Sequence, residues 1–378
     1  CFERHIKDSP YGLAQIMGGD WLDAVDAFGT STVGDLNTIG RGRGVQIRLS
    51  AHLVITLVRF IDLCETPRVM ELVKAQRLDA DLERFKTFAD EVRKNTMKFG
   101  WEDGDNNFHA GFIDSIHEFK LDGSTPDYAR GEVGYTLGSM RGDCDGIKRR
   151  LLPPAGYGLD MLMFDRPYLT PIENRESIVQ KLLRTLDRLF FDPKLGLLLL
   201  SKPVPYTHRN GELIGRLFIT PPGCAENGEY HHGQMFAHMS RLQLPGEANT
   251  VWKQFLPIIS AMRDEKIGGP FENACCSYQS ERQDPHFAQG MYFGLSGSID
   301  WLIEFFQSMA GLEINLIDSQ KPDIRINPKL PDVLQGALTF KRVIHLAEGG
   351  SYRQIPLTLE IASNVKGKKT DGMTLWVN

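Results

Sequence analysis

The spacing of apolar residues changes once along this chain of 378 residues, close to residue 312. Before that point, apolar residues recur every three or four positions, as they do on one face of an α-helix. After it, short runs alternate apolar and polar residues between Pro, Gly and Asn, which is typical of strands. The helical pattern predicts helices over 46–64, 67–98 (with a dividing loop at 79–83), 174–191, 247–263 and 299–310. Strand pairing is also expected near 112–119. We therefore expect a mainly helical domain over 1–311 and a C-terminal β domain over 312–378.

Composition excludes several classes of partner. A hydrophobic content of 42% can bury a large core, and a net charge of −5 with dispersed Lys and Arg gives no general attraction for nucleic acid or for an anionic membrane. The longest apolar run, 195–200, is far shorter than the roughly 20 residues that span a bilayer. The six cysteines form no CxxC pair, so we expect reduced thiols and a cytoplasmic protein.

The richest polar stretch is PPGCAENGEYHHGQMFAHM, residues 221–239. Pro and Gly break the preceding element, Asn227-Gly228 is a turn dipeptide, and apolar residues recur at helical spacing from His232 onward. The stretch therefore places acids, a tyrosine and histidines where a loop turns into a helix. Free N–H groups and imidazoles at a helix start suit an anion or a cluster of sugar hydroxyls.

The segment DWLD, residues 20–23, sets Trp21 between two acids after two glycines. An indole face suits the C–H face of a sugar ring, and a carboxyl beside it has its neutral form favoured by desolvation, as a general acid requires. Helix capping by Asp20, with Asp23 in the first turn, is the alternative.

Other histidines are expected to be structural. His52 lies on a largely apolar helical stretch, and His231 and His238 flank His232 on the helix that begins there. The spacing of His231, His232 and His238 differs from the HExxH spacing of zinc enzymes, and no cysteine pair lies near them in the sequence. We therefore expect no metal.

Six segments, in order, carry a resemblance to a known family. They are GGDWLDAVDAFG (18–29), GRGRGVQIRLSAHLVITL (40–57), WEDGDNNFHAGF (101–112), IGRLFITPPGCAENGEYHHGQMF (214–236), QDPHFAQGMYFGLSGSIDWL (283–302) and INPKLPDVLQGALTFKR (326–342). Together they resemble the inverting glycoside phosphorylases of the cellobiose and chitobiose phosphorylase kind, which include cellodextrin, laminaribiose and β-glucan phosphorylases.

The resemblance implies a fold and partners. It implies the later helices of an (α/α)6 barrel over 1–311, followed by a small β-sandwich-like domain over 312–378. It also implies an upstream β-sandwich and the first barrel helices, from the same or a companion chain, without which this part lacks activity. A homodimer is implied as well. The substrates would be an oligosaccharide and inorganic phosphate, with no cofactor.

The resemblance also implies roles for individual residues. Asp23 takes the general acid role and Trp21 lines the donor-sugar subsite. His232 matches the phosphate-binding histidine, and Ser298, with Ser296 as a close rival, takes the place of a phosphate-binding threonine. The acceptor-sugar subsite draws on three positions, namely Glu226, Tyr230 and Gln234.

Three departures from the family pattern bear on the substrate. Leu22 replaces the asparagine of DWND, Ala225 replaces a frequent lysine, and Ser298 replaces threonine. We expect a β-1,4-linked glucose disaccharide or oligosaccharide, then β-1,3, with β-1,2 and chitobiose behind. Two other functions stay open: an inverting hydrolase with Glu226 or Glu229 as base, and a noncatalytic carbohydrate-binding or scaffold subunit.

Overall fold

The structure is a computed structural model of the chain, and its described residues fall into separate ranges. They are residues 6 and 9 and the ranges 11–15, 44–104, 109–116, 136–137, 152–193, 196–198, 224–258, 276–278, 290–291, 296–315, 323–334, 338–348, 351–361 and 374–377. For part of these, including 224–232, 276–278, 290–291, 296–301 and most of those beyond 337, the backbone path alone is described.

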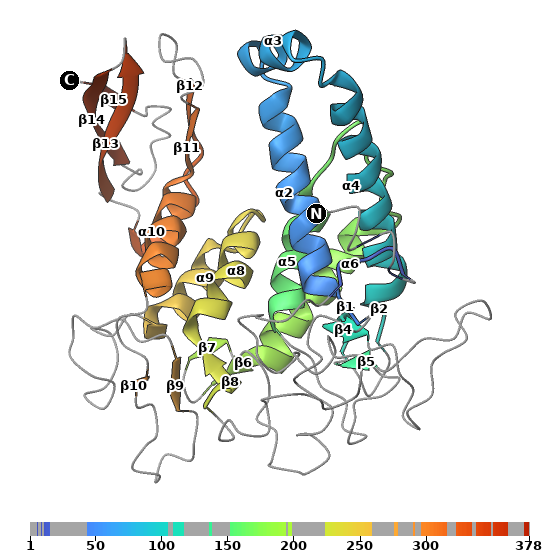
Figure 1. The fold of residues 1–378 in the computed structure, drawn as a ribbon. Helices are drawn as coiled ribbons and strands as arrows, with labels where there is room; N and C mark the ends of the chain where they lie inside the picture. The colour runs from blue at the N-terminus through green and yellow to red at the C-terminus, as the bar shows by residue number, and fades with distance from the viewer. Residues whose placement is uncertain are drawn as a thin grey trace.

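The described part of the chain is mainly helical, as the periodicity predicts. Its helices are α2 (Ile47–Cys64), α3 (Pro67–Ala75), α4 (Asp79–Gly100), α5 (Leu152–Met163), α6 (Arg175–Thr185), α8 (His231–Leu242), α9 (Ala248–Phe255) and α10 (Ser296–Ala310). In Figure 1, α2, α5, α8 and α10 form a row in which each helix packs against the next. Helix α4 packs against α2 and α6 packs against α5, while α9 packs against α8 and, through Phe255 and Phe305, against α10. Within the described ranges, none of the helices combines the length and the apolar content needed to cross a membrane.

The helices between residues 47 and 100, which are α2, α3 and α4, follow the sequence pattern closely. On α2, Val54, Val58 and Ile61 repeat at helical spacing and are fully buried, so this face packs against α4 and α5. Arg77 has a left-handed backbone, with φ at 57°, and it separates α3 from α4. The predicted dividing loop at 79–83 is therefore displaced: the break lies at 76–78, and 79–83 begins α4.

Helix α5 was not predicted, because Pro153 and Pro154 suggested a break. Both prolines lie in the first turn of α5, where a proline removes no intrahelical hydrogen bond. Its two glycines allow close packing. A Cβ on Gly156 would lie 2.9 Å from the backbone nitrogen of Ala237 in α8, and one on Gly158 would overlap the ring of Phe112.

The predicted helices over 174–191 and 247–263 are each interrupted. After α6, residues Leu186–Phe190 form a π-helical turn, η4, and after α9 residues Leu256–Ile258 form a 3-10 turn, η6. Helix α10 begins three residues earlier than predicted, at Ser296 rather than at residue 299. This earlier start places both predicted phosphate-binding serines inside the helix.

Short strands gather at one end of the helices, the lower end in Figure 1. They are β1 (Val45–Gln46), β2 (Trp101–Glu102), β3 (Gly111–Phe112), β4 (Ser115–Ile116), β5 (Thr136–Leu137), β6 (Phe191–Asp192), β7 (Leu197–Leu198), β8 (Cys224–Tyr230), β9 (Cys276–Tyr278) and β10 (Gly290–Met291). They pair as two three-stranded sheets, β1-β4-β5 and β10-β9-β8, and as the two-stranded β2-β3 and β6-β7. Strands β3 and β4 lie within or next to the segment in which strand pairing was predicted.

Two hydrophobic clusters form the core among the described residues. The larger one unites α2, α4, α5, α6 and η4. The smaller one unites α8, α9 and α10, and at its centre Phe255 and Phe305 stack with ring centroids 3.9 Å apart. Helix α8 contributes Ala237 to the larger cluster and Met235 to the smaller one. The position of α8 is therefore fixed from both sides.

Strands follow directly after α10. They are β11 (Leu312–Asn315), β12 (Asp323–Ile326), β13 (Leu338–Glu348), β14 (Ser351–Ile361) and β15 (Thr374–Val377), with a 3-10 turn, η9, at Asp332–Leu334. Strands β13 and β14 pair antiparallel from Leu338 opposite Ile361 to Glu348 opposite Ser351, and β15 pairs with the other edge of β14. This strand content agrees with the alternating pattern after residue 312, while the division into two domains stays a prediction.

The end of α10 is joined closely to the strands that follow. Gly311 has φ at 62°, and a Cβ there would overlap the carbonyl oxygen of Asn327, so the junction requires a glycine. Farther on, Asn249 at the start of α9 makes two hydrogen bonds with Asp332, one to its backbone N–H (2.7 Å) and one to its carboxylate (2.9 Å). The segment after β12 is thus held against α9.

Candidate functional site

The polar stretch around residue 230 forms a bulged strand that leads into a helix. In β8, Cys224 is opposite Tyr278 and Glu229 is opposite Ser277, so one step along β9 corresponds to five along β8. Residues 225–228 therefore form a bulge, which contains Glu226 and the predicted turn Asn227-Gly228. Tyr230 ends the strand, opposite Cys276.

The strand before Ser296 and Ser298 ends level with the strand before His232. Strand β9 pairs antiparallel with both β8 and β10, so β8 and β10 run in the same direction. Tyr230 and Met291 both lie opposite Cys276 and are the last residues of their strands. Because neighbouring strands are about 4.8 Å apart, these two strand ends are separated by about 10 Å.

A helix begins shortly after each of these strand ends. His232 lies in the first turn of α8, directly after β8. Ser296 and Ser298 lie in the first turn of α10, and α10 begins five residues after the end of β10. The two helices pack against each other. The first turn of each helix offers backbone N–H groups without intrahelical partners, together with the positive end of the helix dipole. Two adjacent helix starts of this kind suit an anion.

The predicted general acid lies outside the described residues. Neither Asp23 nor Trp21 belongs to the described ranges, so their distance from His232 stays a prediction. The nearest described residue before them is Gln15, which forms a β-bridge with Val45. Val45 belongs to the sheet β1-β4-β5, at the start of α2. Gln15 thus lies at the strand-bearing end of the helices.

Gln234, predicted to line the acceptor subsite, has a fully buried side chain. Neither Oε1 nor Nε2 of its amide has a hydrogen-bond partner. One turn later on α8, His238 is also fully buried, and neither of its ring nitrogens has a partner. Burial, followed by the charge of Arg241, lowers the pKa of His238 to about 3. Its imidazole is therefore neutral at pH 7, which agrees with the predicted structural role.

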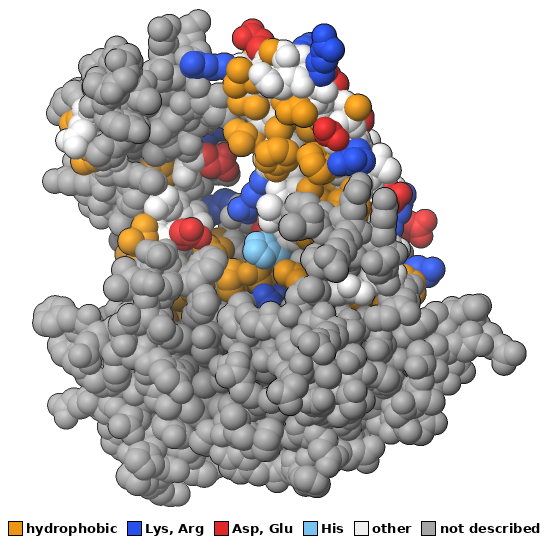
Figure 2. All heavy atoms as spheres, viewed as in Figure 1, with side chains coloured by type: hydrophobic (Ala, Val, Ile, Leu, Met, Phe, Trp, Pro, Cys, Tyr) orange, Lys and Arg blue, Asp and Glu red, His pale blue; other side chains and the backbone are white. Residues whose placement is uncertain are grey.

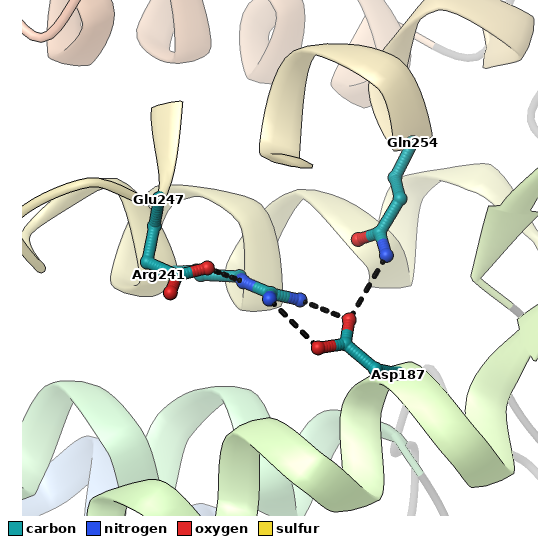
Figure 3. A network of polar contacts seen from close by, with 4 residues as sticks. All are labelled: Asp187, Arg241, Glu247 and Gln254. Carbon is teal, nitrogen blue, oxygen red and sulfur yellow. Dashed lines mark hydrogen bonds and ion pairs between the residues drawn. The ribbon is translucent and has the colours of Figure 1, made fainter. Parts of the chain in front are cut away.

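The C-terminal end of α8 is held by a network of ion pairs and hydrogen bonds around Arg241 (Figure 3). The Arg241 guanidinium, with its side chain only 3% exposed, donates to both carboxylate oxygens of Asp187 in η4, at 2.6 and 2.9 Å. Its Nε donates to Glu247 at 2.6 Å, and Gln254 of α9 donates to Asp187 at 3.2 Å. The two carboxylates raise the pKa of Arg241 against the opposing effect of burial.

Sequence analysis did not single out an aromatic row that crosses three helices. The ring centroids of His52 and Tyr157 are 4.9 Å apart, and those of Tyr157 and Phe236 are 4.5 Å apart. His52 is exposed, so the expectation that it is a core histidine is wrong; Leu49 and Thr56 share its exposed face of α2. Although part of His52 is exposed, its ring packs against that of Tyr157; this partial desolvation, then the charges of Arg48 and Arg59, lower the pKa of His52.

Asp160 on α5 is a second group that sequence analysis missed. Its carboxylate lies 3.4 Å from the Arg59 guanidinium, and burial raises its pKa although Arg59 acts in the opposite direction. Asp160 was missed because it lies in α5, a helix that was not predicted from the sequence. Figure 2 shows a hollow on the face of the molecule that it draws, with a histidine and several Lys and Arg side chains in it.

Metal ligands and similarity to known proteins are two further sources of evidence about the site. Among the residues that the structure describes, no group of three or more His, Cys, Asp or Glu side chains is arranged to hold a metal ion. No protein-family model matches the chain, and a search of curated proteins finds no match to it either.

Proposed function

We propose that this chain is the catalytic part of an inverting glycoside phosphorylase. It would cleave a β-linked glucose disaccharide or oligosaccharide with inorganic phosphate, reversibly, to α-glucose 1-phosphate and a shortened acceptor. One observation carries the proposal: β8 and β10 end level with each other on the two edges of β9, and the helices that follow them pack together. The predicted phosphate ligands His232, Ser296 and Ser298 all lie in the first turns of those helices.

The chemistry requires only one carboxyl group from the protein. Asp23 protonates the departing glycosidic oxygen as general acid, and phosphate, itself an anion, attacks the anomeric carbon from the opposite face. His232 and the serine hydroxyls hold the phosphate in line. Trp21 stacks on the donor sugar, while Glu226 and Tyr230 contact the acceptor. The inversion follows from a single displacement.

The arrangement of the helices supports a barrel as the complete fold. The row α2, α5, α8 and α10, with α4, α6 and α9 packed against it, agrees with the inner and outer layers of an (α/α)6 barrel. We propose that residues 1–311 are the later part of such a barrel and that 312–378 form a β-sandwich-like domain. A cytoplasmic homodimer without a cofactor completes the proposal.

An exposed apolar stripe on α2 supports the need for further helices. Leu49, Phe60 and Leu63 lie on one face of α2 and are 37%, 46% and 43% exposed. They share this face with the exposed His52 and Thr56, and exposed apolar side chains gathered on one face commonly mark an interface. We propose that this face packs against the first barrel helices, supplied by the same or a companion chain.

Two alternatives make different demands on the same residues. An inverting hydrolase on this fold would need a base, Glu226 or Glu229, to activate water. Glu226 lies in the bulge of β8, where its backbone is free of the regular ladder. A noncatalytic carbohydrate-binding subunit would need no acid at all, so Asp23→Asn would then leave its function intact.

The synthetic direction tests the proposal. The full-length gene product is incubated with α-glucose 1-phosphate and a panel of acceptors (glucose, cellobiose, laminaribiose and N-acetylglucosamine), and products are separated by chromatography. We expect one acceptor to be extended with release of phosphate, and Asp23→Asn to abolish extension. The absence of extension with every acceptor would contradict the proposal. Extension that persists in Asp23→Asn would contradict the assigned acid.

A further inference from the structure

Two fully buried polar side chains stand one turn apart on α8. Gln234 and His238 are each 0% exposed, and all four of their side-chain nitrogen and oxygen atoms lack a hydrogen-bond partner. Buried polar groups are nearly always hydrogen-bonded, and each exception calls for an explanation. Leaving them unpaired in an apolar core would cost the full desolvation of each group.

Their described surroundings supply no substitute partner. Met235 on the same helix belongs to the apolar cluster of α8, α9 and α10, and the His238 ring lies edge-on to that of Phe305, 6.3 Å between centroids. Arg241, the nearest cation on α8, is already bound to Asp187 and Glu247. Within the part of the chain that the structure describes, the polar atoms of the pair are therefore left with each other, or with a small polar molecule between them.

The two side chains are complementary through a water molecule. Residues four apart on a helix have Cβ atoms about 6 Å apart, so the ends of these side chains lie within reach of one bridging molecule. A glutamine amide offers one acceptor and an N–H donor, and a neutral imidazole offers one of each. Water, with two donors and two acceptors, matches such a set, and internal waters typically bond to two to four polar groups.

We propose that Gln234 and His238 form an internal water-binding site, in which one water molecule bridges the Gln234 amide and a ring nitrogen of His238. The bridged pair fixes the position of the first turn of α8. Gln234 lies two positions after His232, on the helix whose start is the proposed phosphate site. Gln234 would then act through the position of His232 rather than by touching the acceptor sugar; this second step rests on the proposed function.

A double-mutant cycle in urea unfolding tests the pair without reference to catalysis. Each single variant, Gln234→Leu or His238→Leu, leaves the other polar group buried without its bridge, whereas the double variant removes both. We expect the double variant to be less destabilised than the sum of the singles, by about tenfold in the unfolding equilibrium constant. The exposed His52→Leu, combined with Gln234→Leu, should show no such coupling. Additive effects in both cycles would overturn the proposal.

Nuclear magnetic resonance distinguishes the water from a direct contact. In the parent protein, we expect magnetisation transfer from a slowly exchanging water to the Gln234 side-chain amide, and its loss in His238→Leu. Coupling in the cycle without this transfer would mean a direct hydrogen bond and would overturn the water site.

The positioning role has a separate readout. If the full-length parent catalyses phosphorolysis, His238→Leu should raise the KM for phosphate several-fold with little change in kcat, and His238→Gln should restore it in part. An unchanged KM for phosphate would overturn the positioning role. A parent without phosphorolysis would overturn the proposed function and the role based on it, while the cycle would still test the pair.

Discussion

Arg241 binds Asp187 through both carboxylate oxygens, with Nη1 to Oδ1 at 2.6 Å and Nη2 to Oδ2 at 2.9 Å. This pair joins α8 to η4, and the guanidinium is 3% exposed. Asp187→Leu leaves a buried cation with one remaining carboxylate, Glu247. Because the Asp187 side chain is 43% exposed while that of Arg241 is buried, we expect a loss of about 1–3 kcal/mol in the free energy of unfolding, measured in urea.

An exposed pair provides the matched control. Arg84 and Asp81 lie 3.4 Å apart on α4, with side chains 59% and 47% exposed. Because solvent screens such a pair, Arg84→Leu should cost less than about 1 kcal/mol. Equal losses from Asp187→Leu and Arg84→Leu would show that the buried network has no special role.

Gly156→Ala should loosen the packing of α5 on α8. The added Cβ would lie 2.9 Å from the backbone nitrogen of Ala237, and backbone cannot rotate out of the way. We expect a loss of about 1–3 kcal/mol, seen as a lower Tm. A gain in Tm, as expected for a glycine replaced in an unconstrained helix, would show that the two helices do not approach so closely.

His238 should make the protein sensitive to acid. Its pKa is about 3 in the folded protein, against 6.5 for an unperturbed histidine, so between these values the unfolded chain binds the proton and the folded chain does not. Stability should therefore fall as the pH drops through this window, by up to about 1.4 kcal/mol per pH unit. Urea unfolding at pH 7 and pH 5 should show a smaller pH effect for His238→Gln. Identical pH dependence would mean that His238 is accessible to protons in the folded state.

The apolar stripe on α2 should promote association. Phe60 and Leu63 are 46% and 43% exposed, and the Phe60 ring packs edge-on against Phe85, with 5.9 Å between centroids. Replacing both residues with Gln removes this ring contact, so we expect a loss of about 1–2 kcal/mol in the free energy of unfolding. Sedimentation velocity of the chain alone should show less self-association for this double variant. An unchanged distribution of species would argue against the stripe as an interface.

Local sequence predicted the elements whose causes are local. Helix α2 was found because Val54, Val58 and Ile61 repeat at helical spacing, and the turn at Asn227-Gly228 became the bulge of β8. Helix α5 was missed because Pro153 and Pro154 suggested a break, and the close approach of its Gly156 to Ala237 joins two helices that are far apart in the sequence. Contacts between segments far apart in the sequence cannot be read from spacing.

The candidate site shows the same limit. The sequence placed His232 at a helix start, but the level ends of β8 and β10 depend on their shared pairing with β9, which lies between them. The family resemblance predicted that Gln234 lines the acceptor subsite, and the structure shows that its side chain is buried in the core; the subsite role itself stays a prediction. His52 looked like a core residue and lies on the exposed face of α2.

The dependence of sugar release on phosphate tests the central claim most directly. The full-length protein is incubated with cellobiose and, in parallel, laminaribiose, with and without inorganic phosphate, and 31P nuclear magnetic resonance follows the products. We expect α-glucose 1-phosphate to form with phosphate, no sugar release without it, and a strong loss of product in His232→Ala. Release of free glucose at the same rate with or without phosphate would contradict the account and identify a hydrolase.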